Sequence, residues 1–341
     1  SIAEDARDAG MKVGIVSDVP VDHATPAAFY AKQPNRNQYY EIASQVGGSG
    51  FDFFAAEPCI GNGKANGRPL PAALAADAGY TCVEDRDGLS LAVGVGPVLW
   101  QVPIGFAIDA DDEAIRLIDL VDTGIELLTD EQGFFMMIEG GRIDWSGHAN
   151  DLATNVRGTL DLDAVVERVL AFQAVHPDDC LVVVTADHET GGLQTRFDTG
   201  VDPGGFAAAI DAQQGSYEAF NRSLKDWLEE GAQPGELHQR AIAFYGLAEL
   251  DEEEHELLAS AVGKYAESSN RRYGKRNAIA GACQQILDAR CGVAWTTGGH
   301  TAVDVPTTAI GPGAERFDGH TENSDIALIL RELITAPEST P

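Results

Sequence analysis

The chain has 341 residues, of which 44% are hydrophobic, and carries a formal net charge of −31 at pH 7. That length allows one large domain or two ordinary ones with a substantial core. The excess of carboxylates argues against nucleic acid and anionic membranes as partners, and no apolar stretch is long enough to span a bilayer. The 23 basic residues comprise 17 arginines and only 6 lysines, a balance typical of a salty habitat or of a GC-rich genome.

Strand-like and helix-like stretches alternate along the first part of the chain. A helix is expected at residues 1–10, because Ser1 is a good cap, acidic residues fill the first turn and Gly10 can end it. Strands are then expected at 12–17, 51–56, 80–85, 133–138 and 180–186, with helices at 37–46, 71–79, 111–128 and 150–175. The alternation predicts an α/β fold with a largely parallel central sheet flanked by helices on both faces.

The pattern changes between residues 196 and 290, which are mainly helical and acidic. We interpret this stretch as a helical insertion or cap subdomain, and residues 1–195 with 291–341 as the α/β core. Because the chain starts on a helix cap directly before a strand, the amino-terminal part of that core is expected to lie upstream.

Five cysteines occur at positions 59, 82, 180, 283 and 291, and none lies in a CxxC pair, which disfavours a thiolate zinc site. Cys180 opens an apolar run and is expected to be a buried thiol. Cys283 and Cys291 can form a disulfide in an oxidising compartment, and Cys59 with Cys82 is a weaker pair.

Loops that follow strand-like stretches are rich in oxygen and imidazole ligands. The ligands are Glu139, Asp144 and His148 in residues 136–151, Asp187 and His188 in 182–192, His300 in 296–306, and Asp22, His23 and Thr25 in 19–30. Carboxyl ends of parallel strands are where open α/β sheets bind ligands. Asp and His suit zinc, whereas Glu and Thr oxygens suit magnesium. Several clusters indicate more than one ion, and metals about 4 Å apart are typical of phosphoryl transfer.

Four of these segments together resemble the alkaline phosphatase family: "DHATPAAFYA", "EGGRIDWSGHAND", "TADHETGG" and "GGHTAVDVP". They occur in that family's order and spacing, and the resemblance runs from residue 1 to about 335. It implies a metal-dependent hydrolase of small phosphate monoesters that is periplasmic or secreted and forms a homodimer. It also implies two zinc ions and one magnesium ion. One zinc would take Asp144, His148 and His300, the second Asp187 and His188, and the magnesium Glu139 and Thr25.

Arg36 follows Thr25 by eleven residues, where the resemblance implies the arginine that binds phosphate. A guanidinium suits that role because it binds two phosphate oxygens at once and stays charged at alkaline pH. His23 and Trp145 occupy positions that vary in the family near the metals and the substrate. They are expected to tune the site, for example by supporting the magnesium ligands.

The nucleophile that the resemblance implies is a serine in an Asp-Ser-Ala motif, which would form a phosphoserine intermediate. That motif is absent from these residues, as is the earlier aspartate that would bridge two ions. Ser17, Ser49 and Ser146 lack the motif's context, so the nucleophile is expected upstream of this chain. Two alternatives stay open: a phosphodiesterase, mutase or other phosphotransfer enzyme of the same superfamily, and a non-catalytic fragment that binds metal or phosphate.

Overall fold

A five-stranded parallel sheet forms the centre of the computed structural model, which describes residues 1–63, 66–92, 94, 96–195, 203–267 and 277–335. The strand order is β3-β4-β2-β1-β5, and every pairing is parallel. The strands are β1 (Lys12–Pro20), β2 (Phe53–Glu57), β3 (Thr81–Val83), β4 (Val98–Gln101) and β5 (Phe134–Glu139). The predicted α/β fold is confirmed.

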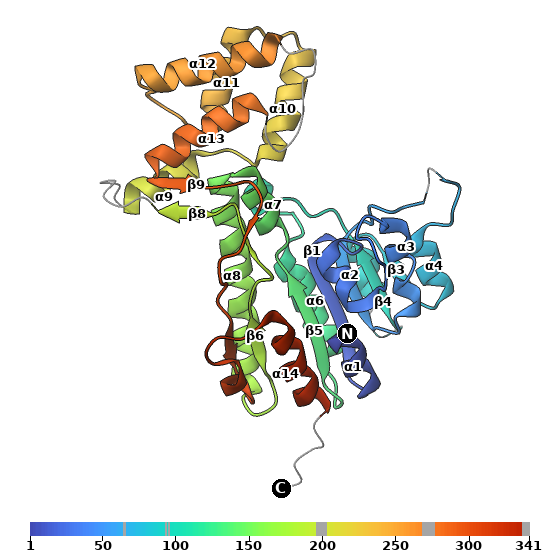
Figure 1. The fold of residues 1–341 in the computed structure, drawn as a ribbon. Helices are drawn as coiled ribbons and strands as arrows, with labels where there is room; N and C mark the ends of the chain where they lie inside the picture. Colours follow the sequence, from blue (N-terminus) through green and yellow to red (C-terminus); the bar gives the residue numbers. More distant parts are fainter. Residues whose placement is uncertain (64–65, 93, 95, 196–202, 268–276, 336–341) are drawn as a thin grey trace.

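Helices cover both faces of this sheet because successive strand residues point to opposite sides (Figure 1). Ile15 and Phe54 pack in one apolar cluster with the helices of the first face, and Val16 and Phe53 pack in another with those of the second. The first face carries α1 (Ile2–Asp8), α2 (Ala24–Tyr30), α3 (Tyr39–Ala43) and α4 (Pro71–Asp77), and the second carries α6 (Leu117–Leu128) and α8 (Leu152–Val175). The remaining short elements of this region are η1 (Val46–Gly48), α5 (Arg86–Ala92) and η3 (Ala107–Asp109).

Helix ends follow local capping chemistry. The Ser1 side chain accepts a hydrogen bond from the Glu4 amide, and the Glu4 carboxylate reaches back to Ser1, which starts α1 where the sequence predicts. Asp151 caps α8 in the same way through the Thr154 amide. The helix predicted at 111–128 begins only at Leu117, because the Asp119 carboxylate accepts a hydrogen bond from the Arg116 amide and caps the helix there.

Two apolar strands are more exposed than the sequence predicts. In β5 only Met137 is fully buried, because the strand pairs with β1 alone among the described residues. The strand β6 (Val182–Val184) is half-buried and pairs antiparallel with β11 (Thr308–Ile310), outside the five-stranded sheet. Cys180, expected to be buried, is only half-buried at the start of this segment.

Two further strand pairs and the carboxyl-terminal segment complete the core. The antiparallel pairs are β7 (Glu189–Thr190) with β10 (His300–Thr301), and β8 (Leu193–Thr195) with β9 (Val293–Trp295). After η4 (Ala314–Phe317), the last helix, α14 (Asn323–Thr335), lies against α1. No helix among the described residues is both long enough and apolar enough to cross a membrane.

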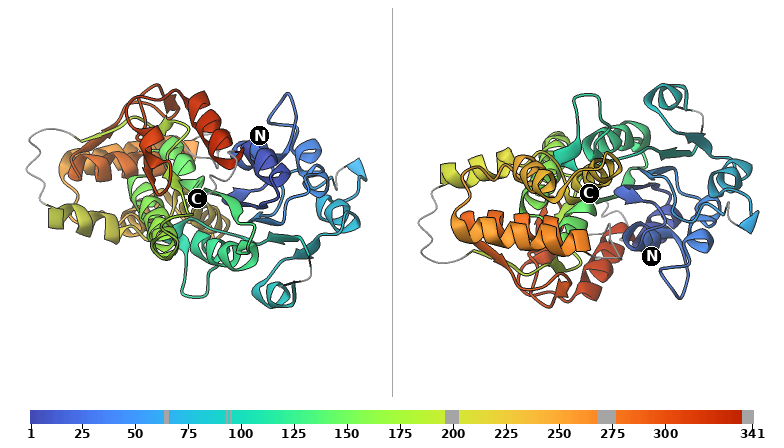
Figure 2. Two further views of the ribbon diagram at one scale, coloured as in Figure 1. Left: turned by 90° about the horizontal axis from the view of Figure 1, so that it is seen from below. Right: turned by 90° about the horizontal axis from the view of Figure 1, so that it is seen from above.

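A group of helices lies apart from the sheet, at the top of Figure 1, and Figure 2 shows the same group from below and from above. They are α9 (Pro203–Ala212), α10 (Tyr217–Glu229), α11 (Pro234–Phe244), α12 (Glu252–Glu267) and α13 (Ala278–Arg290). Their apolar core also includes Leu152 and Ala153 from the first turn of α8. The helical character is as expected, while the proposed domain limits at 196 and 290 stay a prediction.

The disulfides considered from the sequence do not form, because all five cysteines are free thiols. Cys283 lies within α13 and Cys291 caps its end, and both are buried. Burial raises the pKa of the Cys291 thiol to about 11.

Candidate metal centre

Ligand-bearing loops from four parts of the chain meet at one end of the sheet. Glu139 ends β5, and the helix α7 (Arg142–Ala149) directly after it carries Asp144 and His148. Asp187 and His188 follow β6, and His300 opens β10, which pairs with β7 next to them. The predicted ligands therefore come from separate segments and converge on one region.

Three of the predicted ligands have the spacing that a tetrahedral ion requires. The Oδ1 atom of Asp144 lies 3.4 Å from Nε2 of His148 and 3.4 Å from Nε2 of His300. The two Nε2 atoms are 3.2 Å apart. A tetrahedral zinc with bonds of about 2.0–2.1 Å sets its ligand atoms about 3.3 Å from one another. The donor set and its spacing therefore fit zinc.

The His148 ring is oriented by a backbone contact. Its Nδ1 atom lies 2.8 Å from the carbonyl oxygen of Gly298. Since a carbonyl can only accept, the proton is on Nδ1, and the Nε2 lone pair is free for a metal.

Asp187 and His188 lie beside this first set. Their Oδ2 and Nε2 atoms are 3.2 Å apart, and the His188 ring stacks on His300 with centroids 3.5 Å apart. Ligand atoms of Asp144, His188 and His300 lie within 4.8 Å of one another. The sequence assigned His188 and His300 to different ions, and the structure brings them together, as neighbouring ions would require.

Glu139 is half-buried at the end of β5. The Ser17 hydroxyl donates to its Oε2 at 2.5 Å. Burial raises the pKa of Glu139, hydrogen bonds from Ser17 and Thr25 lower it, and the charges of Asp187 and Asp144 raise it further. Three carboxylates thus face one small volume, an arrangement that a bound cation would stabilise.

Arg36 is exposed and contacts His23, with Nη2 3.3 Å from the His23 Nε2 atom. The His23 ring meets Trp145 of α7 edge-on, with ring centroids 5.5 Å apart, so a row of contacts runs from Arg36 through His23 to Trp145. Each of the other twelve described arginines forms an ion pair with a carboxylate of the chain. In so acidic a protein, the guanidinium without a carboxylate partner is the one available to an anion.

Asp22 does not join the centre. It is fully buried, and its carboxylate accepts hydrogen bonds from the amides of Ile60 and Gly61 at 3.1 and 2.8 Å. Its place next to His23 in the sequence reflects the anchoring of a neighbouring loop.

Two residues that sequence reasoning missed support the ligands. Arg142 is buried, donates a hydrogen bond from Nε to the backbone oxygen of Asp18 at 3.1 Å, and forms an ion pair with Glu57 at 2.5 Å, which ties α7 to the ends of β1 and β2. Thr190 contacts two ligands directly, donating to Asp144 at 2.5 Å and lying 3.2 Å from His188 Nδ1. Their positions within the motifs "EGGRID" and "DHETGG" were the available signals.

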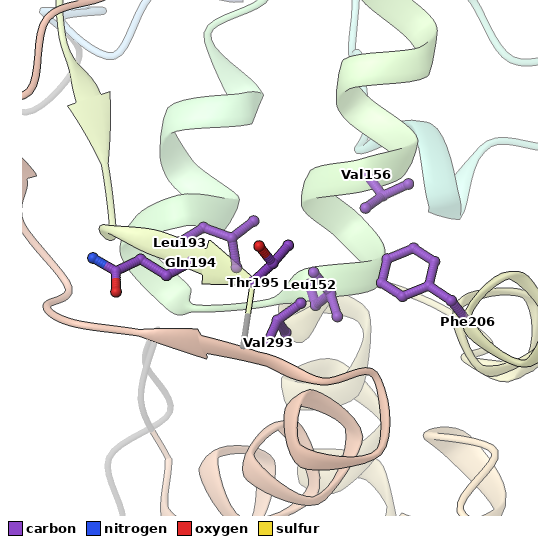
Figure 3. A pocket seen from close by; sticks show the side chains of 7 residues that line it. All are labelled: Leu152, Val156, Leu193, Gln194, Thr195, Phe206 and Val293. Atoms are coloured by element: carbon purple, nitrogen blue, oxygen red, sulfur yellow. The ribbon is translucent and has the colours of Figure 1, made fainter. Parts of the chain in front are cut away.

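An apolar hollow of about 570 Å³ lies elsewhere, where the start of α8 meets β8, β9 and α9 (Figure 3). Its lining residues are Leu152, Val156, Leu193, Gln194, Thr195, Phe206 and Val293. None of them is charged, so the hollow does not suit a phosphate group, and the chemistry belongs to the ligand-rich region.

Comparisons with known proteins all point to one family. The family model described as alkaline phosphatase matches residues 1–55 and 66–335. Alkaline phosphatase 3 of Bacillus subtilis is 29% identical, over 96% of this chain and 69% of that protein. The repressible alkaline phosphatase of Saccharomyces cerevisiae is also 29% identical, over 89% of this chain and 60% of its own.

Solved structures give the same result. A cold-active alkaline phosphatase from a psychrophilic Shewanella has a TM-score of 0.80 at 27% identity, covering 98% of this chain and 78% of the other. The Thermus thermophilus alkaline phosphatase has a TM-score of 0.73 at 26% identity, and the match covers 91% of this chain and 68% of that protein. A variant of the TAB5 alkaline phosphatase, with Mg bound in its M3 site, shares the fold with a TM-score of 0.65 at 23% identity. The match covers 98% of this chain and 75% of that protein.

Proposed function

The chain belongs to the alkaline phosphatase family of phosphatases, and on that premise we propose that it hydrolyses small phosphate monoesters at a centre of two zinc ions and one magnesium ion. The observation that carries the proposal is the spacing of Asp144, His148 and His300, whose ligand atoms lie 3.2–3.4 Å apart.

The ligand sets are those that the family resemblance implies, and the chemistry of the donors is compatible with them. Asp144, His148 and His300 would hold one zinc, and Asp187 with His188 would begin the shell of the second. Glu139 and Thr25 offer the hard oxygens that magnesium prefers. When bound, the ions supply positive charge that stabilises the attacking and leaving oxygens of phosphoryl transfer.

The chain's own residues bind and orient the substrate. Arg36 would hold two non-bridging phosphate oxygens through its planar guanidinium. His23 limits where that guanidinium can lie, since the two side chains are in contact at 3.3 Å, and Trp145 packs against His23. This row would hold the phosphate against the metals in a fixed orientation, which lowers the entropic part of the barrier.

None of the three serines considered from the sequence is suited to be the nucleophile. The Ser17 hydroxyl donates to Glu139, the Ser146 hydroxyl to the Ile143 carbonyl, and Ser49 is buried against Tyr80. We infer that the serine is carried by residues outside the 341, on a strand that pairs with the outer edge of β5. The half-buried apolar side chains of β5 and β6 support this inference, because such a strand would cover them.

The test is turnover by the full-length gene product. Release of p-nitrophenol from p-nitrophenyl phosphate should far exceed release from bis(p-nitrophenyl) phosphate. Chelation should abolish it, and zinc with magnesium should restore it. A preference for the diester would favour the phosphodiesterase alternative, and no turnover by the metal-loaded full-length protein would leave the non-catalytic one. A homodimer and a periplasmic or secreted location are part of the same proposal, to be checked by native mass and by fractionation.

A further inference from the structure

We propose that Thr190 is a positioning residue that links two zinc ligands and selects the ring proton of one of them; the inference rests on the proposed function. Its Oγ1 atom lies 2.5 Å from Asp144 Oδ1 and 3.2 Å from His188 Nδ1. A carboxylate only accepts, so the single hydroxyl proton is donated to Asp144. The hydroxyl oxygen must then accept from His188.

This order of donors fixes the tautomer of His188. If Nδ1 carries the proton that Thr190 accepts, Nε2 keeps its lone pair. Nε2 is also the atom that lies 3.2 Å from the Asp187 carboxylate, within the ligand cluster. The Thr190 hydroxyl therefore presents the correct nitrogen of His188 to a metal and limits the rotation of Asp144 at the same time.

The backbone of Thr190 reaches a third ligand. In the β7–β10 ladder, Thr190 is paired with His300. One residue thus connects α7, the turn after β6, and β10, the three segments that carry the nitrogen and oxygen ligands suited to zinc.

Gly147 makes this contact sterically feasible. A Cβ atom at Gly147 would lie 2.9 Å from the carbonyl oxygen of Thr190 and 3.1 Å from its Cβ atom. Real Cβ atoms rarely approach backbone so closely, so a side chain there would push Thr190 away from α7. The glycine between Asp144 and His148 is thereby explained by packing against Thr190.

The variants Thr190→Val and Thr190→Ser separate the hydroxyl from the shape of the side chain. Valine keeps the branched shape but leaves His188 and Asp144 without their shared partner, whereas serine keeps the hydroxyl. Loss of a group that orients metal ligands typically costs 10–100-fold in metal affinity. We expect Thr190→Val to weaken zinc binding by about that factor, and Thr190→Ser to stay within about threefold of the wild type.

Thr185→Val is the matched control. Thr185 lies in the same segment, but its hydroxyl contacts the Thr307 hydroxyl at 2.8 Å and none of the predicted ligands. Zinc affinity would be measured on the full-length gene product by competition with a chromogenic chelator. The visible spectrum of the cobalt-substituted protein would report ligand geometry, and melting of the metal-free protein would report the fold.

An unchanged zinc affinity and cobalt spectrum in Thr190→Val would overturn the inference, as would an equal loss in Thr185→Val. The inference would also be overturned if the Thr190→Ser variant bound zinc as weakly as the Thr190→Val variant, because the hydroxyl would then be irrelevant. The proposed function fails differently: it is refuted if His300→Ala keeps the full zinc content, whatever the Thr190 variants do.

Discussion

Replacing Arg36 by alanine removes the one described guanidinium that has no carboxylate partner. If Arg36 binds the substrate's phosphate, the variant should bind inorganic phosphate more weakly and turn over monoesters with a lower kcat/KM. The zinc content should not change, because no predicted zinc ligand contacts Arg36 in the structure.

The size of the effect follows from the contacts that would be lost. Hydrogen bonds to charged groups contribute about 1.5–3 kcal/mol each, and a bidentate pair adds geometric specificity. Arg36 is exposed, so solvent screens part of this energy and a total near 2 kcal/mol is expected, a loss of about thirty-fold. Arg36→Lys should recover only part of the lost phosphate affinity, because an ammonium group cannot donate two parallel hydrogen bonds as the planar guanidinium does.

The assay is competitive inhibition of p-nitrophenyl phosphate hydrolysis by inorganic phosphate, with zinc measured on the same samples. Arg316→Ala is the control, since Arg316 is also partly exposed but is paired with Glu332. An inhibition constant in Arg36→Ala equal to that of the wild type would remove Arg36 from the phosphate site. A loss of zinc in the same variant would show that the effect is indirect.

Three other predictions follow from the metal centre, from a buried carboxyl and from the surface charge. Asp144→Asn should lower bound zinc and turnover together, whereas Glu139→Gln should mainly lower bound magnesium; elemental analysis that shows no selective change would contradict the ligand sets. Burial raises the pKa of Asp288 to about 7, so the folded state holds a proton that the unfolded chain releases near pH 4, and stability should fall as pH rises from about 4 to 7. In Asp288→Asn, the slope of the unfolding free energy against pH in this range should become shallower by an amount that corresponds to at most one bound proton, as measured by denaturant unfolding. The net charge of −31 should make the melting temperature rise with salt, mostly below about 0.1 M, where the Debye length is already about 10 Å, and a flat or falling melting temperature would refute this self-repulsion.

The parts of the fold that local chemistry determines were predictable from the sequence. The helix at residues 150–175 appears as α8 at Leu152–Val175, because Asp151 is a strong cap and the apolar pattern continues to the end. Exposure was not predictable for β5 and β6, because an apolar run indicates a strand but not which neighbours cover it. The helix predicted to start at residue 111 starts only at Leu117, because the Asp119 carboxylate accepts a hydrogen bond from the Arg116 amide and caps the helix there.

Ligands of the candidate site could be proposed from the sequence because four ligand-bearing motifs occur together in the order and spacing of the alkaline phosphatase family. The residues that orient them could not. Thr190 and Asp144 are separated by 46 positions, and the position of Thr190 in its motif does not show which side chain it contacts. Arg142 looks like any arginine at a helix start, yet it is 6% exposed and reaches Glu57, 85 positions away.

The two half-exposed strands and the metal centre are physically connected. Glu139 ends β5, and Asp187 follows β6 after two residues, so the two incompletely covered strands both lead into the ligand cluster. A strand lying against β5 and running parallel to it would reach Glu139 at its carboxyl end, as β1 does where Ser17 pairs with Glu139. The same added strand would therefore bury apolar surface and deliver side chains to the centre, where the proposed mechanism would require a serine and a bridging carboxylate.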